Sequence, residues 1–405
     1  MAEPSKKCKK LKTDVDELYF FKEFLWNSRN RELIQTLRNV ISVARFGESG
    51  LHLTFLRINR SNASIEERFS KARVDVDVIK DEDDEIIYVP LAAFFLRGIE
   101  VLKNYFDENQ PFITDDLRKR SALMNLLKFL KKEPTCHTES SGKEIEWKRA
   151  VCFAQHVLMP LVPQKRYCID YHYCCGKCVE SCCKEHQMDG EIIDTSYGCT
   201  KGWHGDVDLM IRDKGVPLSL LKAESERSDK VSDDDIESDV EMKTSEKCSN
   251  DKQQVIAQTI VFSFLQHKLN AKGVNCFVPG LGVSSEKLIF YMYDCVEDVL
   301  LCGLPLDLFK SAGKIRIRTA VVLWLLLNYD IFGNAFPPNV KKHKANFHDH
   351  LGKNILDMYM NEVQQPCHVN LSDKKDESEV PPDKGMIDVF TLLPESDKGT
   401  PIPHV

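Results

Sequence analysis

The chain has 405 residues, of which 42% are hydrophobic and 9% aromatic, so it can bury a sizeable core as one large domain or a few smaller ones. The formal net charge is −7, but 227–252 holds nine acids against five bases and 366–405 eight against four. The remaining body is therefore close to neutral, which neither supports nor excludes a phosphate-bearing partner.

Neither end of the chain nor its interior shows a pattern typical of a secreted or membrane protein. The first residues contain lysines but no apolar run, so we expect no signal peptide. The longest apolar stretch, Thr319–Leu327, is far shorter than the ~20 residues of a membrane span. We therefore expect an intracellular protein, nuclear or cytoplasmic, not secreted and without membrane contact.

The N-terminal region, 14–135, is expected to be mainly helical, after a disordered basic tail at 1–13. Apolar residues recur at helical spacing in three stretches: Asp14–Phe46, Ala92–Phe106 and Asp115–Lys131. Between them, Arg73–Val78 and Ile86–Val89 allow a small hairpin. We identify no chemistry in this region and no protein partner for it.

The region 143–335 mixes helical and strand patterns, which predicts an α/β fold of the α+β type. Its expected helices are Lys143–Leu161, Gln253–Leu269 and Thr319–Ile331. Its expected strands are Glu191–Thr195, Trp203–Arg212, Val216–Glu226, Leu288–Asp294 and Val299–Cys302. A cysteine-rich insert at 168–199 and a disordered acidic loop at 227–252 interrupt the region. A C-terminal helical extension at 336–363, with a helix over Phe347–Glu362, and a disordered tail at 364–405 follow.

Acidic residues are concentrated on two neighbouring strands of this region. Period-two alternation puts Asp206 and Asp208 on one face of the first strand, and Lys222, Glu224 and Glu226 on one face of the next. Strands lie only ~4.8 Å apart, so these acids can converge. Convergent carboxylates repel each other unless a cation is bound, and oxygen ligands favour Mg²⁺ or Mn²⁺. The alternative is that the acids lie on the solvent face of ordinary amphipathic strands.

The preceding helix offers one more acid. Glu146 lies near the apolar face formed by Ala150 and Phe153, whereas Glu144 points to the other side. We therefore prefer Glu146 as a further ligand and keep Glu144 as the alternative.

This order of elements and acids resembles the PD-(D/E)XK nuclease superfamily, between Glu144 and Leu301. The resemblance implies a restriction-endonuclease-like αβββαβ core. It assigns Glu146 to the helix acid, Asp208 to the motif aspartate and Glu224 to the first residue of the (D/E)xK element.

The resemblance extends to the helix that follows and has one departure. Gln254 and Gln258 resemble the glutamine that many members place near the site. The family lysine position holds Glu226 here, which cannot supply a positive charge but can accept a proton or bind a second metal ion. His204 and Lys222 are auxiliary candidates, and each is also typical of a hydrogen-bonded or exposed side chain.

The resemblance implies a metal-dependent phosphodiesterase that acts on DNA or RNA. Asp208 and Glu224 would hold Mg²⁺ or Mn²⁺, while Glu146 and Glu226 would complete the site or take the proton. The alternative is a catalytically inactive relative that serves as a nucleic-acid or protein interaction module. Glu226 and the acidic loop favour this alternative.

The cysteine-rich insert predicts a structural zinc site, because short Cys-x2-Cys spacings deliver two ligands from one turn. The quartet that we prefer is Cys175, Cys178, Cys182 and His186. The competing ligands are His172, Cys174, Cys183 and Cys199. Unliganded thiols or a redox-sensitive cluster are the alternatives to zinc.

Overall fold

The computed structural model describes most of the chain up to Pro366, and the described stretches belong to one compact unit. These stretches are residues 31–46, 51–107, 116–132, 152–163, 167–170, 191–211, 216–221, 249–269, 277–284, 286–310, 313–334 and 339–366. Within them, no helix combines the length and the apolar character that a membrane crossing requires.

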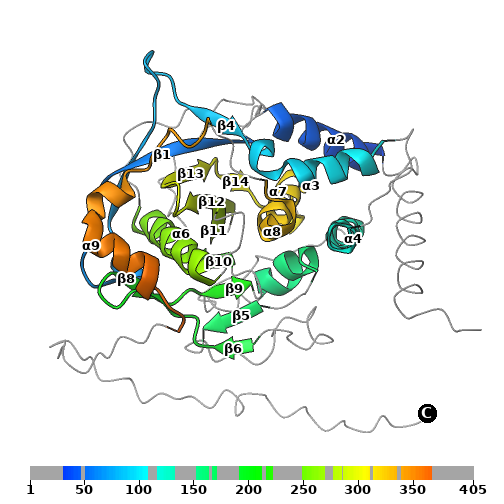
Figure 1. Cartoon of the computed structure of the whole chain (residues 1–405). Coiled ribbons are helices and arrows are strands. Elements are labelled where there is room, and N and C mark those ends of the chain that lie inside the picture. The colour runs from blue at the N-terminus through cyan, green and yellow to red at the C-terminus, as the bar shows by residue number, and fades with distance from the viewer. Residues whose placement is uncertain are drawn as a thin grey trace, which may run out of the picture. The chain divides into compact units, whose positions relative to one another are not determined.

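A large mixed β-sheet forms the centre of this unit (Figure 1). Neighbouring strands follow the order β3 (Val74–Val78), β1 (His52–Ser61), β13 (Val299–Gly303), β12 (Lys287–Asp294), β11 (Phe277–Val283), β10 (Val216–Leu220), β9 (Leu209–Ile211), β5 (Tyr167–Asp170) and β6 (Glu191–Ile193). Two short strands lie off this path: β4 (Tyr88–Pro90), which pairs with β1, and β14 (Leu306–Asp307), which pairs with β12.

Five consecutive strands of this sheet change direction in a defined pattern. β5 and β9 are antiparallel, as are β9 and β10, whereas β10 and β11 are parallel and β11 and β12 are again antiparallel. A parallel pair cannot be joined by a tight turn and needs a crossover. The connection between β10 and β11 contains the helix α6 (Asn250–Leu269), which provides it.

Helix α6 is buried on nearly all sides along its middle. All residues from Val255 to Leu265 are buried, because the helix packs on β11 and β12 and also contacts α9 (Phe347–Glu362). A helix enclosed in this way has no separate solvent-facing side and is not amphipathic along this stretch. Gly280 in β11 allows the close approach, since a Cβ at this position would collide with the Thr259 side chain.

The remaining described helices pack on one another. They are α2 (Arg31–Phe46), α3 (Ala92–Tyr105), α4 (Leu117–Lys132), α7 (Ile317–Leu327) and α8 (Tyr329–Phe332). The indole Nε1–H of Trp324 donates to the carbonyl of Ala122 at 2.8 Å and so joins α7 to α4. The side chain of Asn328 donates to the carbonyl of Leu161, at the end of a 3₁₀ turn (Met159–Leu161) that follows a π-helical turn (Ala154–Leu158). The apolar run in α7 therefore belongs to the core.

The structure also contains a second, small sheet of three short strands. It contains β2 (Glu67–Arg68), β8 (Trp203–Gly205) and β7 (Tyr197–Gly198), in that order. Gly198 exchanges two backbone hydrogen bonds with Gln364, at N···O distances of 3.1 and 3.0 Å. The segment after α9 is thereby joined to β7.

The α/β prediction is confirmed, and several helices and strands match their expected bounds. α9 covers the expected Phe347–Glu362, and α6, β12 and β13 agree within a few residues. The expected strand Trp203–Arg212 is instead two strands, β8 and β9. Gly205 has φ +137°, a value that takes the chain out of extended geometry.

Three strands on the main path of the large sheet, together with the short strands β2, β7 and β14, were missing from the predicted elements. β11 contains Pro279, Gly280 and Gly282, which are uncommon in strand interiors, yet strands pair with it on both sides. β5 lies inside the stretch assigned to the cysteine-rich insert. β1 pairs with β3, β4 and β13, so the N-terminal region contributes strands to the central sheet.

Candidate metal centre

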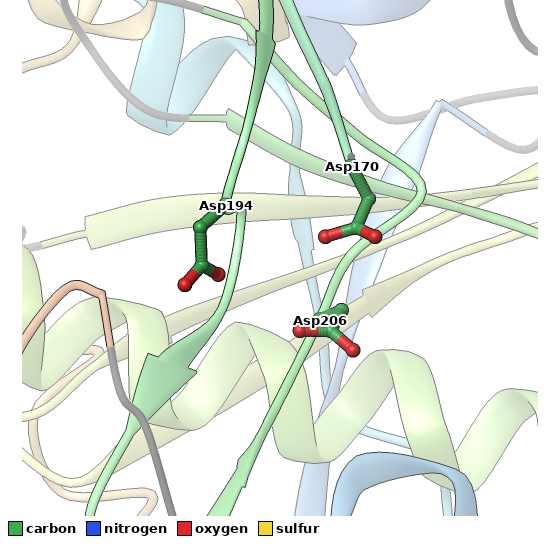
Figure 2. A group of neighbouring side chains, drawn as sticks. All are labelled: Asp170, Asp194 and Asp206. Atoms are coloured by element: carbon green, nitrogen blue, oxygen red, sulfur yellow. The ribbon is translucent and has the colours of Figure 1, made fainter. Parts of the chain in front are cut away.

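Three aspartates gather at one edge of the large sheet: Asp170, Asp194 and Asp206 (Figure 2). Each offers one carboxylate oxygen, and these three oxygens lie within 4.8 Å of one another. Asp170 is only 2% exposed, Asp194 is half-buried and Asp206 is exposed. We refer to these residues as the aspartate trio.

The pairing of three strands explains why the aspartates meet. β5 and β6 are parallel, and Asp170 is paired with Ile193, so Asp170 and Asp194 leave the sheet at the same edge. β9 is antiparallel to β5, with Leu209 paired with Ile169. The residues before β9, including Asp206, therefore enter the sheet at this edge.

Residues 195 and 196 hold two of the three carboxylates by hydrogen bonds. The Thr195 hydroxyl lies 3.0 Å from Asp170 Oδ2, and the Thr195 backbone N–H donates to the same oxygen at 3.4 Å. The backbone N–H of Ser196 donates to Asp194 Oδ1 at 2.8 Å. A carboxylate has two oxygens and about four acceptor positions, so these bonds do not exhaust its capacity to bind a cation.

A buried polar network supports the backbone at Asp206. Gln258 of α6 is 2% exposed, its Oε1 accepts the Ser219 hydroxyl at 2.6 Å, and its Nε2 donates to the carbonyl of Asp206 at 3.4 Å. The hydroxyl of Tyr197 donates to the Gln258 carbonyl at 3.0 Å. Burial raises the pKa of Tyr197 well above its usual range, so this donor keeps its proton. The network joins α6 to β10 and to the chain that leads into β9.

The electrostatics of the aspartate trio favour a bound cation. Ionised carboxylates this close repel each other, and a bound cation relieves that repulsion. Opposite ligand oxygens lie roughly 4.2 Å apart around Mg²⁺ and roughly 4.8 Å apart around Ca²⁺, so one ion can contact all three carboxylates. A purely carboxylate donor set suits Mg²⁺, Mn²⁺ or Ca²⁺ rather than a thiolate-bound zinc ion.

Asp208, the expected motif aspartate, has a different environment from Asp206. Its Oδ2 accepts the backbone N–H of Leu220 at 2.7 Å, next to the β9–β10 pairs. The predicted common face of Asp206 and Asp208 assumed a continuous strand, but residues 206–208 connect β8 to β9 and belong to neither strand. Asp206 therefore joins the aspartate trio, while Asp208 contacts the hairpin backbone.

The auxiliary residues that are described fall in two places. Gln258 is in the network beside Asp206, and Gln254 is half-buried one turn earlier in α6. His204 is buried in β8, with Nδ1 3.0 Å from the Gly202 carbonyl oxygen. Gln258 thus contacts the backbone of Asp206, and the roles predicted for Gln254, Gln258 and His204 stay predictions.

The other predicted site residues lie outside the described residues. They are Glu146, its alternative Glu144, Lys222, Glu224, Glu226 and the zinc quartet Cys175, Cys178, Cys182 and His186. Their roles stay predictions. Of the competing zinc ligands, Cys199 is described: it is buried in the β7–β8 turn, and burial raises the pKa of its thiol.

Sequence reasoning missed Asp170 and Asp194, although a signal for both was present. Each follows an apolar pair, Cys-Ile before Asp170 and Ile-Ile before Asp194, as an acid at the end of a buried strand does. Asp208, which directly precedes Leu209, Met210 and Ile211, was chosen as a candidate because of the same kind of pattern. What the pattern does not contain is the parallel pairing of β5 with β6, which brings together two residues of the stretch assigned to the cysteine-rich insert.

Comparisons with protein-family models, with curated protein sequences and with solved structures find no significant match to this chain.

Proposed function

We propose that the chain is a divalent-cation-dependent phosphodiesterase, a nuclease of the PD-(D/E)XK type, that acts on DNA or RNA. The observation that carries this proposal is the convergence of Asp170, Asp194 and Asp206 at one sheet edge. Carboxylate ligands at such an edge are the usual means of holding Mg²⁺ or Mn²⁺ against a phosphate.

The strand order supports the nuclease-like core. β5, β9 and β10 are three successively antiparallel strands, α6 follows, and β11 then pairs parallel to β10. This is the strand–strand–strand–helix–strand part of the αβββαβ core that the resemblance implies. The aspartate trio lies where β5 ends and where the chain enters β9.

The residues of the trio would have distinct roles. Asp170 is buried and hydrogen-bonded to Thr195, so it would anchor the cation from the protein side. Asp206 is exposed, so a substrate phosphate would approach from its side. Bound Mg²⁺ or Mn²⁺ would polarise a phosphoryl oxygen and lower the pKa of a coordinated water. Glu224 and Glu226 follow β10, whose C-terminal end lies at the same edge, and we propose them as a further ligand or as proton acceptor.

A specific observation favours a second candidate, a catalytically inactive relative that binds nucleic acid or protein. Asp208 aligns with the motif aspartate of the resemblance, yet one of its oxygens is bonded to the Leu220 backbone. The presence of Glu226 at the family lysine position also favours an inactive relative. In this case the zinc predicted for the cysteine-rich insert would stabilise a contact surface.

One assay separates the two candidates. The purified full-length chain is incubated with labelled single- and double-stranded DNA and RNA, in Mn²⁺, Mg²⁺ or EDTA. Asp170→Asn and Asp206→Asn serve as site variants. Asp75→Asn is the matched control, because Asp75 is an exposed aspartate on β3, at the other end of the strand order.

Cleavage that requires the cation, persists in Asp75→Asn and is lost in both site variants would support the nuclease. Retained nucleic-acid binding without cleavage under every condition would support the inactive module. Cleavage that is unchanged in Asp170→Asn and Asp206→Asn would overturn the assignment of the site to the aspartate trio.

A further inference from the structure

Thr195 lies between the three segments that carry the aspartate trio. It directly follows Asp194 and is fully buried. Its hydroxyl oxygen lies 3.0 Å from Asp170 Oδ2 and 2.7 Å from the carbonyl oxygen of Val207, the residue after Asp206. Thr195 belongs to the segment that follows β6. Its side chain contacts β5 and the chain that enters β9.

Thr195 has two donors for these two oxygens. A hydroxyl carries one proton, which it can donate to one acceptor at a time. The backbone N–H of Thr195 also faces Asp170 Oδ2, at 3.4 Å. When the hydroxyl donates to Val207, the N–H still serves Asp170, so both oxygens can be satisfied together.

Packing alone does not account for a threonine at this position. Valine has nearly the same shape and would fill the same volume without a polar atom, whereas a buried hydroxyl is costly unless it is hydrogen-bonded. The contacts of the Thr195 hydroxyl go to the Asp170 carboxylate and to the backbone beside Asp206, both at the candidate metal centre.

We propose that Thr195 is a positioning residue for the cation. Its hydroxyl and its backbone N–H together hold the Asp170 carboxylate and the Asp206–Val207 backbone in a fixed relation, so that the trio is arranged before the cation arrives. This inference rests on the proposed cation site. Residues that orient metal ligands in this way typically change metal affinity by about 10- to 100-fold when they are removed.

The test measures Mn²⁺ binding to the purified full-length chain, by isothermal titration and by the electron paramagnetic resonance signal of free Mn²⁺. Thr195→Val replaces the hydroxyl by a methyl group, and Thr195→Ser keeps the hydroxyl while removing the methyl group. We expect Thr195→Val to bind Mn²⁺ about 10- to 100-fold more weakly and Thr195→Ser to bind it as the wild type does. Asp170→Asn is expected to lose binding.

The thermal midpoint in EDTA distinguishes positioning from packing. A packing role would lower it in both variants and leave the Mn²⁺ affinities alike, which would overturn the inference. If Thr195→Val does not fold, Thr195→Ala takes its place, since Ala and Ser differ only by the hydroxyl group. Equal Mn²⁺ affinity of the Ala and Ser variants would likewise overturn it.

The experiment also separates failure of this inference from failure of the proposed site. If the wild type binds Mn²⁺ and Asp170→Asn does not, but Thr195→Val binds as the wild type does, the site stands and the role of Thr195 falls. If wild type and Asp170→Asn bind Mn²⁺ equally, the cation site itself falls, and the inference with it.

Discussion

The carboxylate of Asp208 accepts a hydrogen bond from the backbone N–H of Leu220, with 2.7 Å between Oδ2 and the nitrogen. The last paired residues of the β9–β10 hairpin are Leu209 and Leu218, so the side chain of Asp208 extends the pairing by one further bond. It takes the place that a backbone carbonyl would have if the strand continued. Asp208 is therefore expected to affect stability more than cation binding.

Replacing Asp208 tests this assignment. We expect Asp208→Ala to lower the free energy of unfolding by about 1–3 kcal/mol, because the half-buried Leu220 N–H loses its acceptor. Asp208→Asn keeps an acceptor oxygen and should be close to the wild type. Urea denaturation and Mn²⁺ titration of both variants check the prediction. Loss of Mn²⁺ binding at unchanged stability would show instead that Asp208 is a ligand, as the sequence pattern suggested.

Cation binding to the aspartate trio should stabilise the folded chain. At free Mn²⁺ of about 100 times Kd, linkage adds about 2.7 kcal/mol to the free energy of unfolding. Asp194→Asn and Asp206→Asn should lose this gain, yet unfold at a slightly higher temperature than the wild type in EDTA, because repulsion is relieved. Calorimetry with and without Mn²⁺ measures both effects. Asp75→Asn is the control, and an equal Mn²⁺ shift in all variants contradicts the prediction.

Asp294, the last residue of β12, should make stability depend on pH. Burial raises the pKa of this carboxyl, although the N–H groups of Val296 and Glu297, each 2.9 Å from Oδ1, lower it in part. A raised pKa means that the folded chain holds the proton more tightly than the unfolded chain. The contribution of Asp294 to stability is therefore largest at low pH and is lost as pH rises through the folded-state pKa.

Asp294→Asn removes this dependence while keeping an acceptor for both N–H groups. We expect the variant to be more stable than the wild type near pH 7, and the two to become alike below about pH 4, where the carboxyl is protonated in both states. Urea denaturation between about pH 3 and pH 8 measures the difference. A difference of the same size at every pH would rule out ionisation as its cause.

The Ser219–Gln258 hydrogen bond should show strong coupling. Gln258→Leu leaves the buried Ser219 hydroxyl without this acceptor, which we expect to cost about 1–3 kcal/mol. Adding Ser219→Ala should recover part of the loss, with a coupling energy of about 0.5–3 kcal/mol in a double-mutant cycle. Tyr197→Phe serves as a comparison, since it removes a different bond to Gln258. Additive effects of the first two substitutions would contradict the coupling.

The zinc prediction has its own test. The purified chain is expected to contain zinc, and Cys178→Ser should reduce the zinc content measured by mass spectrometry. Cys302→Ser is the control, because Cys302 is a half-buried cysteine of β13. An unchanged zinc content after Cys178→Ser would argue against the quartet that includes it.

Helices and strands whose own residues show the apolar pattern typical of that structure were predictable from the sequence. α9 has a helical pattern on both sides of a kink at Gly352, and β12 is a continuous apolar strand, so both were found close to their observed bounds. β11 was not found, because Pro279 and the glycines weaken its strand pattern. Its strand geometry is imposed by β10 and β12 on either side and by α6 above Gly280.

The candidate site was predictable only in part, for a related reason. Asp206 and Gln258 were found because each lies beside a recognisable strand or helix pattern. Asp170 and Asp194 are brought together by the parallel pairing of β5 with β6, which no local pattern contains. Asp206 joins the aspartate trio and Asp208 bonds to Leu220 because the strand is broken between β8 and β9, near Gly205. This break is likewise a property of the folded chain.

The paired hydrogen bonds between Gly198 and Gln364 bear on how the chain can be shortened for crystallisation or solution work. Gly198 is four residues beyond Asp194, so a deletion that starts before Gln364 would loosen the loop that carries this aspartate. A deletion that starts after Pro366 removes most of the C-terminal acidic stretch. It keeps both hydrogen bonds between Gly198 and Gln364, and these hold the loop. The second shortened form is therefore the one in which cation binding should survive.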